Sequence, residues 1–221
     1  MTALNKDKIE AISLNCSRGW LGEDVSFLSE LKFVRCLSIT TSEIKNLNAI
    51  ENMESLEHVQ LTSCPSEPVD FTKLTKLNTC YLYWWKGALS IFSCTWLNEL
   101  YLDGAKLKDF SGLGNLVNLE KLVIANSNIK SLDWLPNLTK LKELDLTNCK
   151  GLEDFSSISQ LHNLNKLVIE GCKKLENIKF VKNLDYLEWL DLSANGNIAS
   201  LSGLSGANNL KILFFTGSTI I

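Results

Sequence analysis

A repeating leucine pattern between Leu97 and Asn209 is the strongest constraint on how this chain folds. Five consecutive segments of 22 or 23 residues each begin with L-x-x-L-x-[LI]. A fixed period of this length, with leucines at constant offsets, is the signature of a solenoid whose neighbouring coils bury a shared core. Alternate side chains of a strand point to opposite faces, so the leucine offsets face inwards. The pattern predicts an α/β, right-handed solenoid with a parallel β-sheet on its concave face and short 3-10 or α-helical turns on its convex face.

Less regular units flank these repeats. We expect an N-terminal cap and first unit over residues 1–33, eight repeats over 34–209 and a terminal half repeat over 210–221. The apolar residues between Trp20 and Leu31 predict a helical segment that closes the open end of the core. The fourth unit, 77–96, departs furthest from the pattern and places Trp85 where a small polar residue is usual. No linker or low-complexity segment interrupts the array, so we predict a single domain over 1–221.

The net charge, the hydropathy and the cysteine content indicate which partners and which cellular compartment to expect. The formal charge of −3 argues against nonspecific nucleic-acid binding, which needs concentrated Lys and Arg. The polar start MTALNKDKIE lacks the apolar stretch of a signal peptide, and no apolar run is long enough to span a bilayer. Seven scattered cysteines do not form a disulfide framework and are interpreted as reduced thiols. The expectation is a cytoplasmic protein without nucleic-acid or membrane partners.

The core pattern extends to L-x-x-L-x-[LI]-x-x-[NCS]-x-[IL], with endings such as FSGLGNLVN and LDWLPNLTK. In this it resembles leucine-rich repeat proteins, and the period is most similar to that of the internalin and protein-phosphatase-regulator subtype. The resemblance covers roughly residues 9–221. It implies that an asparagine at the ninth repeat position bonds backbone groups between coils.

That asparagine survives only at Asn195. The residues at the same position elsewhere are Ser42, Cys64, Trp85, Ala105, Ser127, Cys149, Cys172 and Ser218. Cysteine is a common substitute in the family, so the resemblance gives three thiols a structural role. Cys149 and Cys172 could also lie within disulfide reach, but the turn role is favoured. Trp85 and Ala105 cannot act in this way, so those turns must be satisfied differently.

Stacked repeats place equivalent positions in columns along the outer face of the sheet. One column alternates in sign through Glu99, Lys121, Glu143 and Lys166. Opposite charges on adjacent strands favour each other by roughly 0.2–1 kcal/mol. This column is therefore interpreted as a self-neutralising surface.

An aromatic cluster is the main candidate site for binding a partner. The register places its members on the solvent side of two adjacent strands: Tyr81, Tyr83, Trp84 and Tyr101. Neighbouring leucines already occupy the inward positions, and clustered exposed aromatics are typical of recognition surfaces. The alternative is that these rings pack on one another to cover an irregular, shortened repeat.

Acidic residues accompany the aromatics on the predicted concave face. They outnumber the unpaired bases and comprise Asp103, Asp145, Glu170 and Asp191. Trp189 and Phe214 form a second, smaller aromatic patch. A face of this kind suits a protein partner that presents Lys or Arg. The alternative, for any single acid, is an ordinary solvated carboxylate.

The sequence gives no support for catalysis, a metal or a cofactor. Its two histidines, His58 and His162, are about five repeats apart, so a triad or a zinc site is not expected. No phosphate-cradling glycine motif occurs. Asp145 and Asp191 are expected two strands apart with Val168 between them, and nothing supplies the apolar burial that would tune one as an acid. We therefore expect a protein that is not an enzyme.

The resulting hypothesis is a non-catalytic protein–protein interaction module that binds one partner on its concave face. The resemblance implies two roles for such a face, an inhibitor of the immunity or antitoxin type and a regulator of an enzyme such as a phosphatase. The residues do not choose between them. The alternative is a structural scaffold that self-associates through the uncapped strand edge at 210–216. We accordingly expect a monomer or a weak dimer formed through that edge.

Overall fold

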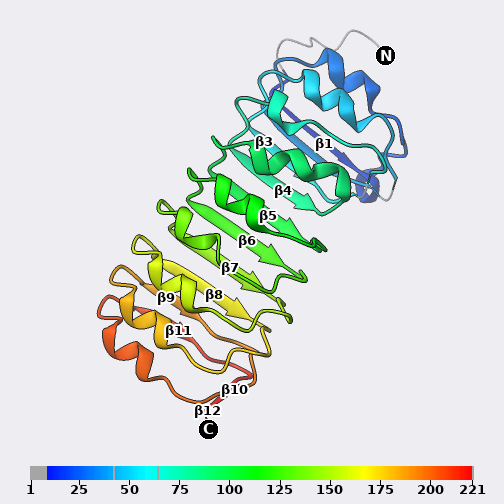
Figure 1. Ribbon diagram of the computed structural model, residues 1–221. Helices are drawn as coiled ribbons and strands as arrows, with labels where there is room; N and C mark the ends of the chain where they lie inside the picture. Colours follow the sequence, from blue (N-terminus) through cyan, green and yellow to red (C-terminus); the bar gives the residue numbers. More distant parts are fainter. Residues whose placement is uncertain (1–8, 42, 64, 221) are drawn as a thin grey trace. The chain divides into compact units, whose positions relative to one another are not determined.

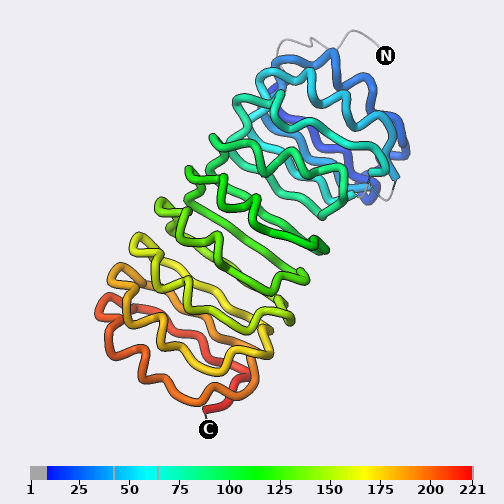
Figure 2. The backbone as a smooth tube through the Cα atoms, in the orientation of Figure 1, coloured from blue at the N-terminus to red at the C-terminus, as the bar shows by residue number. Residues whose placement is uncertain are grey.

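The computed structural model of the protein describes residues 9–220 except 42 and 64. These form two compact units, Met1–Leu97 and Asn98–Ile221, which are described separately. The backbone of each unit winds through successive coils (Figures 1 and 2). The boundary coincides with the start of the five regular repeats. The single-domain assignment of 1–221 stays a prediction, and the turn residues Ser42 and Cys64 lie outside the described residues.

Unit 1 contains a parallel sheet with the strand order β1-β2-β3-β4. Its strands are β1 (Ala11–Asn15), β2 (Cys36–Thr40), β3 (His58–Leu61) and β4 (Thr79–Tyr83). Short 3-10 segments lie on one side of the sheet (Figure 1). They are η3 (Ser26–Glu30), η4 (Leu47–Asn52), η5 (Phe71–Lys73) and η6 (Lys86–Ser93). A further 3-10 turn, η2 (Cys16–Arg18), directly follows β1.

Unit 2 contains a parallel sheet with the order β5-β6-β7-β8-β9-β11. Its strands are β5 (Glu99–Asp103), β6 (Lys121–Ala125), β7 (Glu143–Thr147), β8 (Lys166–Glu170), β9 (Trp189–Asp191) and β11 (Ile212–Phe214), while β10 (Asn197–Ile198) pairs with β12 (Thr219–Ile220). The 3-10 segments are η7 (Ser111–Asn115), η8 (Leu135–Asn137), η9 (Ser156–Gln160), η10 (Lys179–Asn183) and η11 (Ser202–Gly206). The sheet face opposite these segments is called the open face.

The predicted register is confirmed within each unit. Leu100 pairs with Leu122, Leu122 with Leu144, and Leu144 with Leu167. These leucines are fully buried, whereas the alternating residues Tyr101, Val123 and Asp145 are partly exposed on the open face. The solenoid architecture expected from the repeat is therefore confirmed: parallel strands on one side and short 3-10 turns on the other.

The ninth-position side chains bond the backbone of neighbouring coils. Asn195 is fully buried, donates from Nδ2 to the carbonyl of Ile169 (2.6 Å) and accepts from the backbone N–H of Cys172 (2.8 Å). The thiol of Cys172 donates to the carbonyl of Leu146 (3.2 Å), and that of Cys149 to Ile124 (3.4 Å). The bond implied by the resemblance is confirmed, and both cysteines act as thiol donors to backbone carbonyls, as free cysteines.

The irregular fourth unit satisfies its turn by another route. Trp85 is buried, and its indole N–H donates to the carbonyl of Glu67 (3.0 Å), in the loop of the preceding repeat. Its ring also meets Phe71 edge-on, with centroids 6.2 Å apart. The expectation that this turn differs from the others is confirmed.

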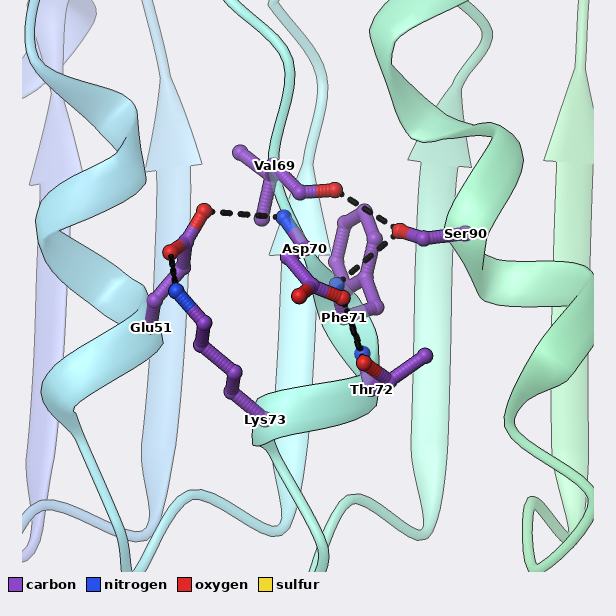
Figure 3. A network of polar contacts seen from close by, with 7 residues as sticks. All are labelled: Glu51, Val69, Asp70, Phe71, Thr72, Lys73 and Ser90. Atoms are coloured by element: carbon purple, nitrogen blue, oxygen red, sulfur yellow. Dashed lines mark hydrogen bonds and ion pairs between the residues drawn. The ribbon is translucent and has the colours of Figure 1, made fainter.

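A polar network joins η4, η5 and η6 beside that loop (Figure 3). Glu51 accepts from the backbone N–H of Asp70 (2.9 Å) and pairs with Lys73 (2.6 Å). Ser90 donates to the carbonyl of Val69 (2.7 Å) and accepts from the backbone N–H of Phe71 (3.0 Å). Side chains from both neighbouring coils therefore hold the shortened third repeat in place.

The N-terminal cap is less helical than expected. Between Trp20 and Leu31 only Ser26–Glu30 forms a 3-10 segment, and the side chains of Val25 and Leu28 are buried. Leu21 is 91% exposed, so the prediction that this residue helps to close the core is wrong. The chain from Gly19, which has a left-handed φ of 93°, to Glu23 is irregular and carries Leu21 away from the core.

Candidate functional site

The three aromatic residues predicted on the surface of unit 1 differ in how far they are exposed to solvent. Tyr81 is half-buried on the open face, and Tyr83 is 43% exposed. Trp84 is only 8% exposed, and its ring stacks on Phe92 of η6 at 5.5 Å. The prediction that Trp84 lies on the solvent side is wrong. Strand β4 ends at Tyr83, so the alternation of faces no longer applies to the next residue, which turns beneath the sheet.

Tyr101, the fourth member of the predicted cluster, belongs to unit 2 and is half-buried on β5. The Lys121 ammonium lies 5.4 Å from the centre of its ring. Its hydroxyl donates to Glu99 at 3.3 Å. The alternating column of charges did not indicate this cation–π contact, although the pairing of Tyr101 with Val123 beside Lys121 places the two side chains on one face.

The charged column of unit 2 is partly self-neutralised. Lys121 pairs with Glu143 at 3.0 Å across β6 and β7, as the alternating signs predict. Burial alone would lower the pKa of Lys121, but hydrogen bonds to Glu143 and Tyr101 outweigh burial, and the pKa is raised. The next base, Lys166, lies 5.3 Å from the centre of the Trp189 ring. Both lysines are therefore held by aromatic rings on the open face.

Asp145 lies in the middle of this face, in a small hollow of about 180 Å³. The hollow is lined by Tyr101, Lys121, Leu122, Val123, Glu143, Leu144, Asp145, Lys166 and Val168. Thr147 donates to one carboxylate oxygen at 2.6 Å. Burial nevertheless raises the pKa of Asp145, because it outweighs this hydrogen bond and the Lys166 charge. The expectation that nothing buries this carboxylate is wrong, since the valines on both adjacent strands restrict its contact with water.

The second predicted aromatic patch lies two and three strands from Asp145 along the open face. Trp189 is half-buried on β9, Phe214 is 40% exposed on β11, and the ring centres are 5.1 Å apart. Asp191 lies between Val168 and Phe214 in the register. One of its carboxylate oxygens accepts from the backbone N–H of Ser193 at 2.8 Å.

The remaining predicted acids lie at the carboxyl ends of their strands. Asp103 ends β5 and accepts from the Asn126 amide at 2.7 Å, whereas Glu170 ends β8 and is exposed. The name acidic face is used below for the part of the open face of unit 2 formed by Asp145, Glu170, Trp189, Asp191 and Phe214.

Among residues 9–220 without 42 and 64, no group of three or more His, Cys, Asp or Glu could hold a metal ion. No helix in this part of the chain is both long and apolar enough to cross a membrane. The geometry of the acidic face is instead that of a recognition surface, with partly exposed rings beside carboxylates.

Residues 117–160 match the family of leucine-rich repeats, in a model that spans two copies of the repeat. The disease resistance protein RPP4 of Arabidopsis thaliana is 36% identical over 103 residues, which are 44% of this chain and 8% of that protein. The disease resistance protein RML1B of the same plant is 29% identical over 158 residues, or 70% of this chain and 16% of that protein. The chain thus spans a small fraction of the length of these curated relatives.

Solved structures of bacterial proteins share the fold. An internalin of Listeria monocytogenes aligns over 97% of this chain and 69% of its own, with a TM-score of 0.67 and 19% identity. Internalin C2 of the same bacterium aligns over 96% and 83% of the two chains, with a TM-score of 0.67 and 22% identity. At these identities the likeness concerns the fold alone. Together with the repeat register and the turn asparagine, it shows that this chain has the leucine-rich repeat fold, and residues 117–160 match that family.

Proposed function

We propose that this chain is a non-catalytic protein-binding module whose partner presents Lys or Arg to the acidic face. The leucine-rich repeat fold is a typical protein–protein interaction module, which supports the general role. The observation that carries the specific proposal is Asp145, a carboxylate partly removed from water to which Thr147 alone donates among the described residues. A cation from a partner would compensate this desolvated charge.

The surroundings of Asp145 favour a protein over a small ligand. The hollow is small, so it suits the end of one side chain. Trp189 and Phe214 offer a partly exposed aromatic pair on the same face, two and three strands from Asp145. Residues of this type often dominate the binding energy of interfaces. Tyr81 and Tyr83 of unit 1 and Tyr101 and Asp103 of unit 2 are proposed as further contacts.

Neutralising two acids on this face is expected to weaken the complex. We expect Asp145→Asn combined with Asp191→Asn to reduce partner affinity at least tenfold, which is about 1.4 kcal/mol, because charge complementarity is lost. The measurement is quantitative capture from a lysate of the producing cell, followed by titration of the recovered protein. The matched control is Asp133→Asn combined with Asp185→Asn, which removes two exposed charges from turns of unit 2. Equal loss in both variants would reject the acidic face as the binding surface.

The effect of binding on the partner is also part of this proposal. The relatives are named disease resistance proteins, and recognition of another protein is the contribution that we propose for repeats of this kind. If the chain is an inhibitor or regulator, an enzymatic activity of the captured partner changes on titration with the wild-type chain. The free cysteines support the proposal that the module acts in the reducing cytoplasm.

Self-association is the second candidate, and exposed apolar residues on β11 favour it. Ile212, Leu213 and Phe214 are each 39–40% exposed, although Leu213 pairs with the fully buried Leu190. Within the described residues β11 pairs with β9 alone, so its other edge can accept a strand. Sedimentation at several concentrations tests this candidate. A mass that rises with concentration, and falls to that of a monomer in Leu213→Lys, would support it, and a concentration-independent monomer would remove it.

A further inference from the structure

A basic hollow lies at the edge of unit 2, beyond the carboxyl ends of β5, β6 and β7. Its volume is about 460 Å³. The residues that line it are Lys106, Asn126, Ser127, Asn128, Lys130, Asn148, Lys150 and Gly151. No acidic side chain is among them, although the chain as a whole carries a net charge of −3. The hollow is formed by the loops that follow the strands, and is thus distinct from the acidic face.

The three lysines of the hollow differ in the hydrogen bonds that they make. Lys106 donates to the carbonyl of Asn126 at 2.8 Å, and Lys173, further along the same column, donates to the equivalent carbonyl of Ala194 at 2.5 Å. Lys150 occupies the same repeat position but makes no such bond within the described part of the chain. Neither Lys150 nor Lys130 makes an ion pair or hydrogen bond with any described residue. Two ammonium groups at this hollow are therefore available to a ligand.

The asparagines give the hollow a fixed frame. Asn126 and Asn148 adopt left-handed conformations, with φ of 51° and 54°, and the amide of Asn148 donates to that of Asn126 at 3.1 Å. Asn128 bonds both backbone groups of Leu107, at 3.0 and 3.1 Å. These bonds link three consecutive coils. The backbone that carries the lysines is consequently ordered before any ligand binds, which lowers the entropic cost of binding.

We infer that this hollow binds an oxyanion with two or more negative charges, of the phosphate ester or diphosphate class. Lysine binds phosphate as a point charge with several donors, and no residue that lines the hollow is acidic. The nearest acids are engaged elsewhere: Asp103 accepts from the Asn126 amide, and Glu153, whose charge acts on Lys130, is paired with Lys174. The volume lies within the range of ligand sites and exceeds that of one water molecule many times. The inference is independent of the acidic face, because it concerns other residues and the opposite charge.

The test is titration of the whole chain with inorganic pyrophosphate. Binding is monitored through the amide chemical shifts measured by nuclear magnetic resonance. We expect saturable shifts confined to residues 126–130 and 148–151. Lys130→Gln combined with Lys150→Gln should weaken binding at least tenfold and leave the fold intact, since neither lysine has a structural bond. Lys106 is left unchanged because it bonds the backbone of the next coil. The matched control, Lys179→Gln combined with Lys182→Gln, removes two lysines of η10.

Two sources could supply this chemistry, a small phosphorylated molecule and a phosphorylated protein. A peptide with two phosphoserines is therefore titrated in a parallel experiment. The site is supported if either ligand binds saturably and that binding is lost in the Lys130/Lys150 variant. The tighter of the two identifies the source. Shifts that do not saturate, shifts spread over all lysines, or equal weakening in the control variant would overturn the inference.

Discussion

Replacing Trp84 by alanine is expected to lower the free energy of unfolding by about 3–5 kcal/mol, the range for truncating a buried tryptophan. The ring is 8% exposed and stacks on Phe92 with an interplanar angle of 16°. Removing it leaves a cavity beneath η6 that the surrounding backbone can close only in part. Chemical denaturation, monitored by far-ultraviolet circular dichroism, measures the change in the free energy of unfolding.

Tyr83→Ala is the natural control, because Tyr83 is the adjacent residue and is 43% exposed. We expect it to cost less than about 1 kcal/mol, the scale of substitutions at exposed positions. Equal costs for the two variants would contradict the placement of Trp84 in the core. The two variants also differ in their use for binding experiments, because any affinity for a partner lost in Trp84→Ala would reflect a damaged fold. Tyr83→Ala is therefore the cleaner probe of partner contact on unit 1.

Asn195→Ala is expected to destabilise unit 2 by about 2–4 kcal/mol. The variant removes both partners of buried backbone groups, the carbonyl of Ile169 and the N–H of Cys172. Each buried group left unsatisfied costs about 1–3 kcal/mol. Thermal and chemical unfolding of the two chains measure the loss. Asn197→Ala, at an exposed position two residues away, should change the stability by less than about 0.5 kcal/mol.

Asn195→Cys is expected to lower the stability by less than Asn195→Ala does. A thiol can donate to the carbonyl of Ile169 as Cys172 does to Leu146, but it is a poor acceptor for the N–H of Cys172. The cysteine variant should therefore retain part of the stability lost in Asn195→Ala. A cysteine variant as unstable as the alanine variant would show that the thiols of this column contribute little.

The sequence alone predicted the parts of the fold that depend on the repeat. Leucine spacing determined which side chains point inwards, and strand alternation then identified the face that carries Tyr101, Asp145 and Trp189. Charge alternation also anticipated the pair between Lys121 and Glu143. These features follow from a local rule that holds as long as each strand stays regular.

The rule failed where the strand ended or where burial depended on neighbours. Trp84 follows the last residue of β4, so alternation no longer determined its direction. The burial of Asp145 arises from valines on both adjacent strands and from long side chains that line the hollow. The basic hollow was missed because its lysines come from loops of three repeats, where no strand period relates them. Side-chain positions in three dimensions were needed for all three.

The most direct test of the central claim is carboxylate labelling of the chain with and without its captured partner. A water-soluble carbodiimide modifies accessible Asp and Glu, and mass spectrometry quantifies each site. If the partner binds the acidic face, labelling of Glu170 and Asp191 falls several-fold in the complex, while labelling of Asp133 and Asp185 is unchanged. Undiminished labelling of Glu170 and Asp191 in a saturated complex would contradict the account.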